Sequence, residues 1–276
     1  MLGLSPAVID IVHASTPCTL DMQTLGKQAP QSPVASDDDG GEDEAVCLSD
    51  GTVDESTRKN ATRVLARLDP DGKAMMLLGQ DKAKLGRGGV VWPAGLCFAQ
   101  WLFEANDAGT FDFQNRSVLE LGSGTGIVGL TAARLGAARI VLTDVSCVLP
   151  LLRRNVKLSA VERERVVVSS LMWGDESAAS QLCESFGAFD FLIGAEIVYG
   201  GANLGALFTT MKQVCTESTT VLLAFKHRND EGVAEDFIKK LMALFMTVQQ
   251  IHIEHMDEVS SGSILIAKQM RCSEQG

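Results

Sequence analysis

The sequence predicts an α/β fold, with a Rossmann-like and mostly parallel sheet covered by helices on both faces. From residue 117 onward, short β-branched apolar runs alternate with segments in which apolar residues recur every three or four positions, as in the strand–helix units of a parallel sheet. The last two strand-like runs are joined by a polar link, residues 256–262, that is too short for a crossover helix. They therefore form an antiparallel hairpin. The expected sheet has seven strands, five parallel ones and that hairpin.

Each expected element follows from its own pattern. Strands are expected where β-branched and other apolar residues run together, at 117–122, 139–144, 165–171, 189–198 and 219–225, with the hairpin at 248–255 and 263–270. Helices are expected where apolar residues share one face, at 127–135, 148–158, 176–186, 204–215 and 232–246. Before this body, residues 63–80 are expected to form an accessory hairpin, because Asp69-Pro-Asp-Gly72 is a turn sequence.

The charge of the chain is concentrated near its N-terminus. The formal net charge is −11, and residues 1–60 hold eleven acidic residues against three basic ones. Such a segment repels itself and has few bulky apolar groups. Residues 1–57 are therefore expected to be an acidic, flexible region, and residues 58–276 the folded domain. The folded body is nearly neutral and shows no basic face of the kind that nucleic-acid binding needs.

Cysteine spacing and hydropathy indicate the cellular compartment in which the chain is expected to work. The seven cysteines are scattered without a C-x-x-C pair, which is typical of reduced thiols rather than of disulfides or a zinc site. No metal site is expected. The N-terminus lacks the basic region of a secretion signal, and no apolar run approaches the ~20 residues of a membrane span. We therefore expect a monomer of the cytoplasm, or also of the nucleus, that acts without a membrane.

The most specific motif is the glycine-rich stretch Glu120-Leu-Gly-Ser-Gly-Thr-Gly126, which lies between an expected strand and an expected helix. Strand, glycine loop and helix N-terminus together expose backbone N–H groups to a bound nucleotide or nucleoside. Two cofactor classes fit. Gly124, Gly126 and Gly129 match the dinucleotide pattern G-x-G-x-x-G, with Asp144 about 20 residues further on. In the other arrangement, the acid at the start of the stretch precedes a G-x-G-x-G loop.

The second arrangement resembles motif I of the seven-strand methyltransferases that use S-adenosylmethionine, in which the acid faces the cationic methionine end of the cofactor. In the dinucleotide arrangement Glu120 and Gly122 have no role, and a carboxylate beside a pyrophosphate is repulsive. A dinucleotide fold also requires a sixth parallel strand where this chain has a hairpin. Five strand–helix units closed by a hairpin resemble the class I methyltransferase topology. These observations favour S-adenosylmethionine over NAD.

Further segments resemble the family 16 methyltransferases, most of which are protein lysine methyltransferases of the seven-strand class. The resemblance covers about residues 60–270, and the matching segments keep the family's order: Gly-Arg-Gly-Gly-Val-Val-Trp-Pro-Ala-Gly-Leu at 86–96, Leu-Thr-Asp at 142–144, Leu-Leu-Arg-Arg-Asn-Val at 151–156, Leu-Met-Trp-Gly at 171–174 and Ala-Glu-Ile-Val-Tyr at 195–199. The family's signature after the fourth strand is A-D-x-x-Y. Glu196 departs from it, because the charge is kept but the carboxylate reaches about one methylene further.

The resemblance implies a division of roles among the site residues. The residues that it assigns to the cofactor are Trp92, Glu120, Gly122, Gly124, Asp144, Trp173 and Ala195. It assigns Glu196 and Tyr199 to the acceptor: the carboxylate holds and orients a lysine amine, and the ring face attracts a cation. From its place at the end of the fifth strand, Arg228 is expected to form an ion pair with a site acid, and His227 to be a surface residue.

The expected function is transfer of a methyl group from S-adenosylmethionine to a lysine side-chain amine of a protein. Two other functions remain compatible with the sequence: a small-molecule N- or O-methyltransferase on the same fold, and a non-catalytic binding module whose pocket has decayed. The intact glycine loop and Asp144 argue against the second of these. An NAD-dependent oxidoreductase is a third alternative, which the C-terminal hairpin disfavours.

Overall fold

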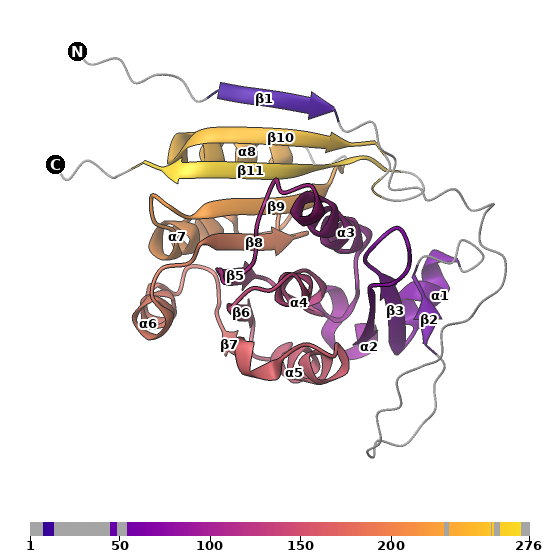
Figure 1. Ribbon diagram of the computed structural model, residues 1–276. Coiled ribbons are helices and arrows are strands. Elements are labelled where there is room, and N and C mark those ends of the chain that lie inside the picture. The colour runs from indigo at the N-terminus through magenta and orange to yellow at the C-terminus, as the bar shows by residue number, and fades with distance from the viewer. Residues whose placement is uncertain are drawn as a thin grey trace, which may run out of the picture.

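The structure is a computed structural model, and it describes residues 8–13, 45–48, 54–228, 232–254, 256 and 260–271. An eight-stranded sheet runs through the domain (Figure 1), in the order β1-β10-β11-β9-β8-β5-β6-β7. Seven of these strands are the predicted ones: β5 (Ser117–Leu121), β6 (Arg139–Asp144), β7 (Val166–Ser170), β8 (Phe191–Ala195), β9 (Thr220–Lys226), β10 (Phe245–Ile253) and β11 (Gly262–Met270).

The strand directions confirm the predicted topology. Strands β5 to β9 pair in parallel with one another, and β11 is antiparallel to both of its neighbours, β9 and β10. The strand order reverses between β8 and β5, which lie side by side at the centre of the sheet. In open α/β sheets, ligands bind at such a reversal, beyond the carboxyl ends of the strands.

Helices cover both faces of the sheet, as predicted (Figure 1). One apolar core lies under α3 (Pro93–Asp107), α4 (Ile127–Arg134) and α5 (Leu149–Leu158). The other lies under α6 (Glu176–Phe186), α7 (Leu204–Val214) and α8 (Val233–Leu244). Successive residues of β5 point into opposite cores, Val118 into the first and Leu119 into the second, as expected for a strand that is covered on both faces. Across the described residues, no helix has the length and apolar character to cross a membrane.

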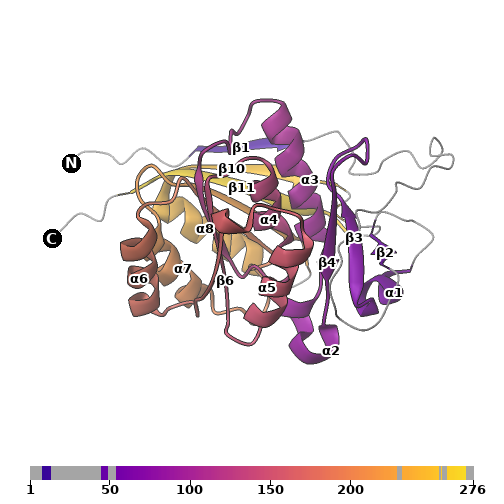
Figure 2. The same cartoon turned by 60° about the horizontal axis from the view of Figure 1, so that its bottom comes forward.

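The predicted accessory hairpin is present at the side of the domain (Figure 2). It consists of β3 (Arg63–Arg67) and β4 (Met75–Gly79), which are antiparallel, and a short strand β2 (Val46–Cys47) extends it. The carboxylate of Asp69 closes its turn by accepting hydrogen bonds from the backbone N–H groups of Lys73 and Ala74. The short helices of the domain are α1 (Glu55–Asn60), α2 (Lys82–Leu85), η1 (Gly86–Gly89) and η2 (Arg163–Arg165).

A fully buried asparagine on α5 connects the accessory hairpin to the glycine loop. The side-chain oxygen of Asn155 accepts a 2.7 Å hydrogen bond from the N–H of Gly79. Its amide nitrogen donates to the carbonyls of Gly79 and Thr125, at 3.0 and 2.9 Å. Gly79 ends β4 and Thr125 lies in the glycine loop, so one amide fixes the hairpin against the loop.

The N-terminal region differs from the expectation in two places. Strand β1 (Val8–His13) lies within residues 1–57, which the sequence assigns to a flexible region, yet it pairs in parallel with β10 as an eighth strand. Helix α1 begins at Glu55, before the predicted domain boundary, because Asp54 caps it by accepting a hydrogen bond from Thr57 N. The acidic cluster at 37–44 lies outside the described residues.

Candidate active site

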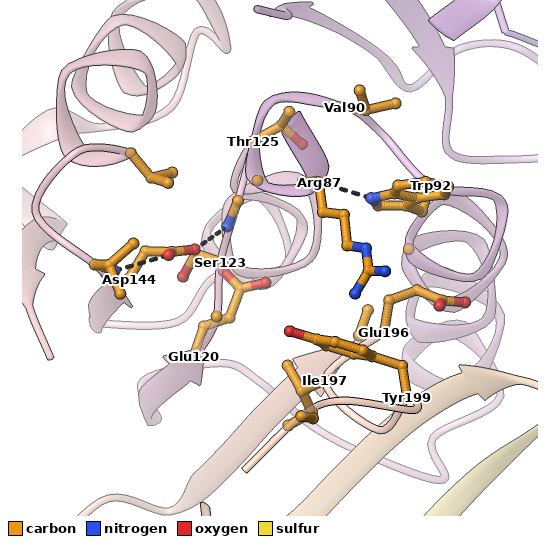
Figure 3. Close-up of a pocket in the computed structure, with 18 of the residues that line it drawn as sticks. Arg87, Val90, Trp92, Glu120, Ser123, Thr125, Asp144, Glu196, Ile197 and Tyr199 are labelled. Carbon is orange, nitrogen blue, oxygen red and sulfur yellow. Dashed lines mark hydrogen bonds between the residues drawn. The ribbon is translucent and has the colours of Figure 1, made fainter. Parts of the chain in front are cut away.

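A cavity of about 850 Å³ opens at the carboxyl ends of β5, β6 and β8, where the strand order reverses (Figure 3). It is large enough for a nucleoside-sized ligand. All nine site residues predicted from the sequence line this cavity: Trp92, Glu120, Gly122, Gly124, Asp144, Trp173, Ala195, Glu196 and Tyr199. The fold thus brings together residues that lie more than 100 positions apart in the chain.

The glycine loop forms the floor of the cavity, and its conformation requires glycine. Gly122, Gly124 and Gly126 have φ angles of 62°, 53° and 84°, in the left-handed region that other residues rarely adopt. A Cβ on Gly122 would lie 2.9 Å from Cγ2 of Ile197 and 3.3 Å from the ring of Trp173, both of which line the cavity. A side chain at Gly122 would therefore narrow the site.

Asp144, at the end of β6, ties its carboxylate to this loop. One oxygen accepts a 2.8 Å hydrogen bond from Gly124 N, and the other accepts a 2.7 Å bond from Val145 N. Burial raises the pKa of Asp144, and these two backbone bonds oppose that rise. Each oxygen keeps a further lone pair, because a carboxylate has about four acceptor positions. Asp144 lines the cavity, and such positions can accept hydroxyl hydrogens of a ribose.

Glu120 lies deeper than a direct cofactor ligand would. Its side chain is buried, and its carboxyl accepts a 3.2 Å hydrogen bond from Gly129 N inside α4. Burial raises the pKa of Glu120 to about 8, and the neighbouring Asp144 adds to that rise. Gly129 lets α4 pack closely on the sheet, since a Cβ there would lie 2.2 Å from Leu142 and 2.6 Å from the Glu120 carboxyl.

We expect the stability of the protein without ligand to fall as pH rises from about 4.5 to about 8, with Glu120 as one cause. In this window the unfolded chain has lost the Glu120 proton while the folded protein keeps it, so rising pH favours unfolding. Glu120→Gln should flatten the dependence and raise the free energy of unfolding at pH 8 by on the order of 1–3 kcal/mol. Urea titrations at pH 5 and pH 8 measure this, with the exposed Glu217→Gln as control. Equal pH dependence in the wild type and Glu120→Gln would contradict the assignment.

The segment before α3 forms the roof of the cavity (Figure 3). The indole Nε1 of Trp92 donates a 2.9 Å hydrogen bond to the carbonyl of Arg87. The next residue, Gly88, lies directly on the glycine loop, because a Cβ on Gly124 would be 3.2 Å from the Gly88 carbonyl. Gln80 anchors the segment by accepting a 2.7 Å bond from Val91 N. The indole hydrogen bond and the Gln80 anchor thus hold Trp92 at the cavity.

The side of the cavity beyond β7 is apolar. Trp173 is half-buried there, and the neighbouring Met172 is 65% exposed at the rim. The loop that carries them is held to α7 by a 2.8 Å hydrogen bond from Gly174 N to Thr210 Oγ1. Such a wall suits the flat face of an adenine.

Glu196 and Tyr199 face the cavity from the loop that follows β8. Glu196 has a φ of 58°, an uncommon angle for a residue other than glycine. Its backbone N–H donates to the carbonyl of Ala224, and its side chain is only 9% exposed. Arg228 forms an ion pair with this carboxylate, which confirms the predicted pairing of Arg228 with a site acid. Burial raises the pKa of Glu196, and Arg228 opposes the rise.

Two features of the site differ from the expectation. His227 is half-buried rather than a surface residue, because its ring contacts the hydroxyls of Ser261 and Ser263 on the C-terminal hairpin. The ring of Tyr199, predicted to receive a cation from the acceptor, already has one: the guanidinium of Arg87 lies 4.8 Å from the ring centroid. Arg87 carries no separate signal in the sequence, since only the fold places it over a residue 112 positions away.

These features fit S-adenosylmethionine better than a dinucleotide. The antiparallel β11 stands where a dinucleotide fold has a parallel strand. The glycine floor, the Asp144 carboxylate and the apolar wall at Trp173 line one cavity at the carboxyl ends of the strands. The fold and the site together define a class I methyltransferase that uses S-adenosylmethionine.

Comparison with known proteins identifies the family. A family model described as lysine methyltransferase matches residues 71–243. Protein N-lysine methyltransferase METTL21A of Xenopus tropicalis is 32% identical over 182 residues, which cover 65% of this chain and 78% of that protein. EEF1A lysine methyltransferase 3 of Mus musculus is 33% identical over 172 residues, covering 62% and 67%. The chain belongs to the family 16 lysine methyltransferases.

A solved structure supports the fold independently. A protein of Streptococcus mutans described as an S-adenosylmethionine-dependent methyltransferase superposes with a TM-score of 0.52 at 13% identity, and the match covers 75% of this chain and 55% of that one. At this identity the likeness shows the fold alone.

Proposed function

We propose that this enzyme methylates the side-chain amine of a lysine in a protein substrate, and that Glu196 and Tyr199 hold that amine at the carboxyl end of β8. The observation that carries the proposal is the position of Glu196. A buried carboxylate on a residue with φ of 58° lines the same cavity as the glycine loop and Asp144. Both burial of a charge and a left-handed backbone cost free energy, and such costs concentrate at functional sites.

Seven residues are proposed to hold the cofactor. Asp144 accepts from the ribose hydroxyls, and Gly122 and Gly124 let the ligand approach the main chain. Trp173 lies against the adenine, and Trp92 closes the roof of the cavity. Ala195, at the end of β8, has a small side chain that leaves room for the cofactor. Glu120 acts from beneath the loop, by fixing the first turn of α4 through Gly129 N.

The chemistry requires mainly positioning. S-adenosylmethionine, when bound, supplies an electrophilic methyl group on a sulfonium, which a neutral amine can displace. Holding the amine at the correct distance and angle can contribute up to ~7–11 kcal/mol toward lowering the barrier. Glu196 can accept an N–H of the amine, which orients the nitrogen lone pair toward the cavity. Tyr199 confines the aliphatic part of the lysine with its ring.

We also propose that the enzyme is a monomer of the cytoplasm and binds no nucleic acid. The cysteines at 47, 97, 147, 183 and 215 are free thiols, as is usual in a reducing compartment. The acidic sequence pI of about 4.8 disfavours binding to nucleic acid.

Transfer of labelled methyl groups to proteins of a cell lysate tests the function. We expect wild type to label at least one protein on lysine and Glu196→Gln to label it at least ~100-fold more slowly, since the variant loses the oriented acceptor. Glu184→Gln, on α6, is the matched control and should label at the wild-type rate. Label on small molecules alone would favour the alternative methyltransferase function. If Glu196→Gln labels as fast as wild type, the assignment of Glu196 to the acceptor site is wrong.

A further inference from the structure

Each of the two acceptor residues has an arginine partner from a distant part of the chain. Arg228, just after β9, pairs through Nη2 with the Glu196 carboxylate, and its Nη1 lies 3.5 Å from the carbonyl of Val198. Arg87, in η1, lies with its guanidinium over the ring of Tyr199, as Figure 3 shows. Arg228 therefore braces both ends of the 196–198 turn, and Arg87 covers one face of the ring.

The pairing changes the charge that an incoming lysine meets. One Glu196 oxygen accepts a 3.2 Å hydrogen bond from Lys226 N, and the other accepts from Arg228. The carboxylate is thus neutralised within the protein, while Arg87 adds a second positive charge beside the ring. A lysine ammonium at this position would be a third cation. Like charges nearby disfavour the charged form of an amine and lower its pKa.

We propose that Arg228, assisted by Arg87, makes the acceptor site take lysine as the neutral amine, with Arg228 acting as a positioning residue for Glu196. This inference rests on the proposed function. The lysine proton leaves to bulk water before the amine settles, so no protein base is needed. The remaining N–H groups of the amine can donate to Glu196, and its lone pair stays available for attack. Without Arg228, the carboxylate would have no guanidinium partner and would pair with the unreactive ammonium instead.

Of the other charged groups, Lys226 lowers the pKa of Glu196 less than Arg228 does, and the rest lie elsewhere. Asp144 and Glu120 lie on the cofactor side, where Asp144 accepts from Gly124 and Val145, and Glu120 accepts from Gly129. The Cys147 thiol also lies on the cofactor side, beyond β6. On β9, Lys226 contributes its backbone N–H to Glu196, and His227 contacts the hairpin serines.

The pH dependence of kcat tests the proposal, because kcat reports ionisations in the enzyme–substrate complex. The acceptor is the lysine protein that wild type labels in lysate, purified and used at saturation. In Arg228→Met we expect the rising limb of the profile to shift to higher pH by about one pH unit. Glu196→Gln leaves the positive charge of Arg228 without a partner, so the rising limb of that variant's profile should move to lower pH. The double variant Glu196→Gln/Arg228→Met should return near the wild-type limb, and Arg228→Lys should stay near it.

Two controls separate this effect from a loss of structure. Arg116→Met breaks a 3.4 Å ion pair with Asp190 at the opposite end of the sheet and should leave the limb in place. S-adenosylmethionine affinity, measured by calorimetry, should be unchanged in Arg228→Met. If that variant does not fold, Arg87→Met supplies the test, with a smaller upward shift expected because Arg87 is exposed.

The outcomes distinguish the inference from the function on which it rests. The inference is overturned if the rising limb of the pH profile does not move in Arg228→Met or, where that variant does not fold, in Arg87→Met. The lysine methyltransferase function would still stand. A downward shift in either variant also overturns the inference. If wild type labels no lysine protein at all, the proposed function falls, and the inference falls with it.

Discussion

Replacing Asp144 by alanine is expected to weaken S-adenosylmethionine binding by about 100-fold, or about 3 kcal/mol. The carboxylate accepts from the backbone of Gly124 and Val145 and keeps acceptor positions free on the cavity wall. Its loss removes the proposed hydrogen bonds to the ribose and leaves Gly124 N without its partner. Both effects act at the cofactor, since Gly124 lies in the loop that forms the cavity floor.

Calorimetric titration with S-adenosylmethionine measures this effect. Asp144→Asn retains one side-chain oxygen and should lose about 10-fold. Asp190→Ala is a matched control, because Asp190 also accepts hydrogen bonds through both oxygens, from Ser117 N and Oγ and from Arg116 Nη1, but lies before β8 at the other end of the sheet. It should bind with wild-type affinity. Wild-type affinity in Asp144→Ala would show that the acid is not part of the cofactor site.

Replacing Asn155 by alanine is expected to lower the free energy of unfolding by about 3 kcal/mol, which for a domain of this size is roughly 10 °C in Tm. The fully buried amide makes three hydrogen bonds, one from Gly79 N and two to the carbonyls of Gly79 and Thr125. Alanine leaves these backbone groups buried without that partner. Cofactor affinity should fall as well, because Thr125 belongs to the glycine loop.

Thermal and urea unfolding measure the loss. Asn60→Ala is the matched control: Asn60 also uses its amide in hydrogen bonds, to Ser56 and from Lys82, but these are exposed. It should change stability by less than about 0.5 kcal/mol. If Asn155→Ala is equally mild, the hairpin and the glycine loop are held together by apolar packing instead.

Local sequence patterns predicted the helices and strands well, because each element depends mainly on the spacing of apolar residues within its own segment. Helix α6 has the predicted bounds, and β6 matches residue for residue. In both, apolar periodicity is uninterrupted. The differences lie at element ends and near the N-terminus. Strand β1 exists through its register with β10, from Val8 opposite Thr247 to His13 opposite His252, and no pattern within residues 8–13 predicts a partner more than 200 positions away.

The sequence also predicted which residues meet at the carboxyl ends of β5 and β6. A glycine loop after a strand and an acid after the next strand are short-range signals, and parallel strands place their carboxyl ends at one edge. Glu120, Gly124 and Asp144 therefore meet as soon as β5 and β6 pair in parallel. Their detailed contacts were not predictable: the Glu120 carboxyl accepts a hydrogen bond from Gly129 N in the first turn of α4.

The sequence alone predicted the fold class and the methyl donor, because alternating periodicity, the glycine loop and the family's motifs are all signals within short stretches of the chain. The residues assigned to the donor side line one cavity, and their contact with the cofactor stays a prediction. The charge of the acceptor side depends on the three-dimensional structure. Arg87 and Arg228 reach Tyr199 and Glu196 only after η1, β8 and β9 have come together. Electrostatic interactions act through space, so the sign of the charge that a lysine meets is set by which side chains the fold brings within a few ångströms.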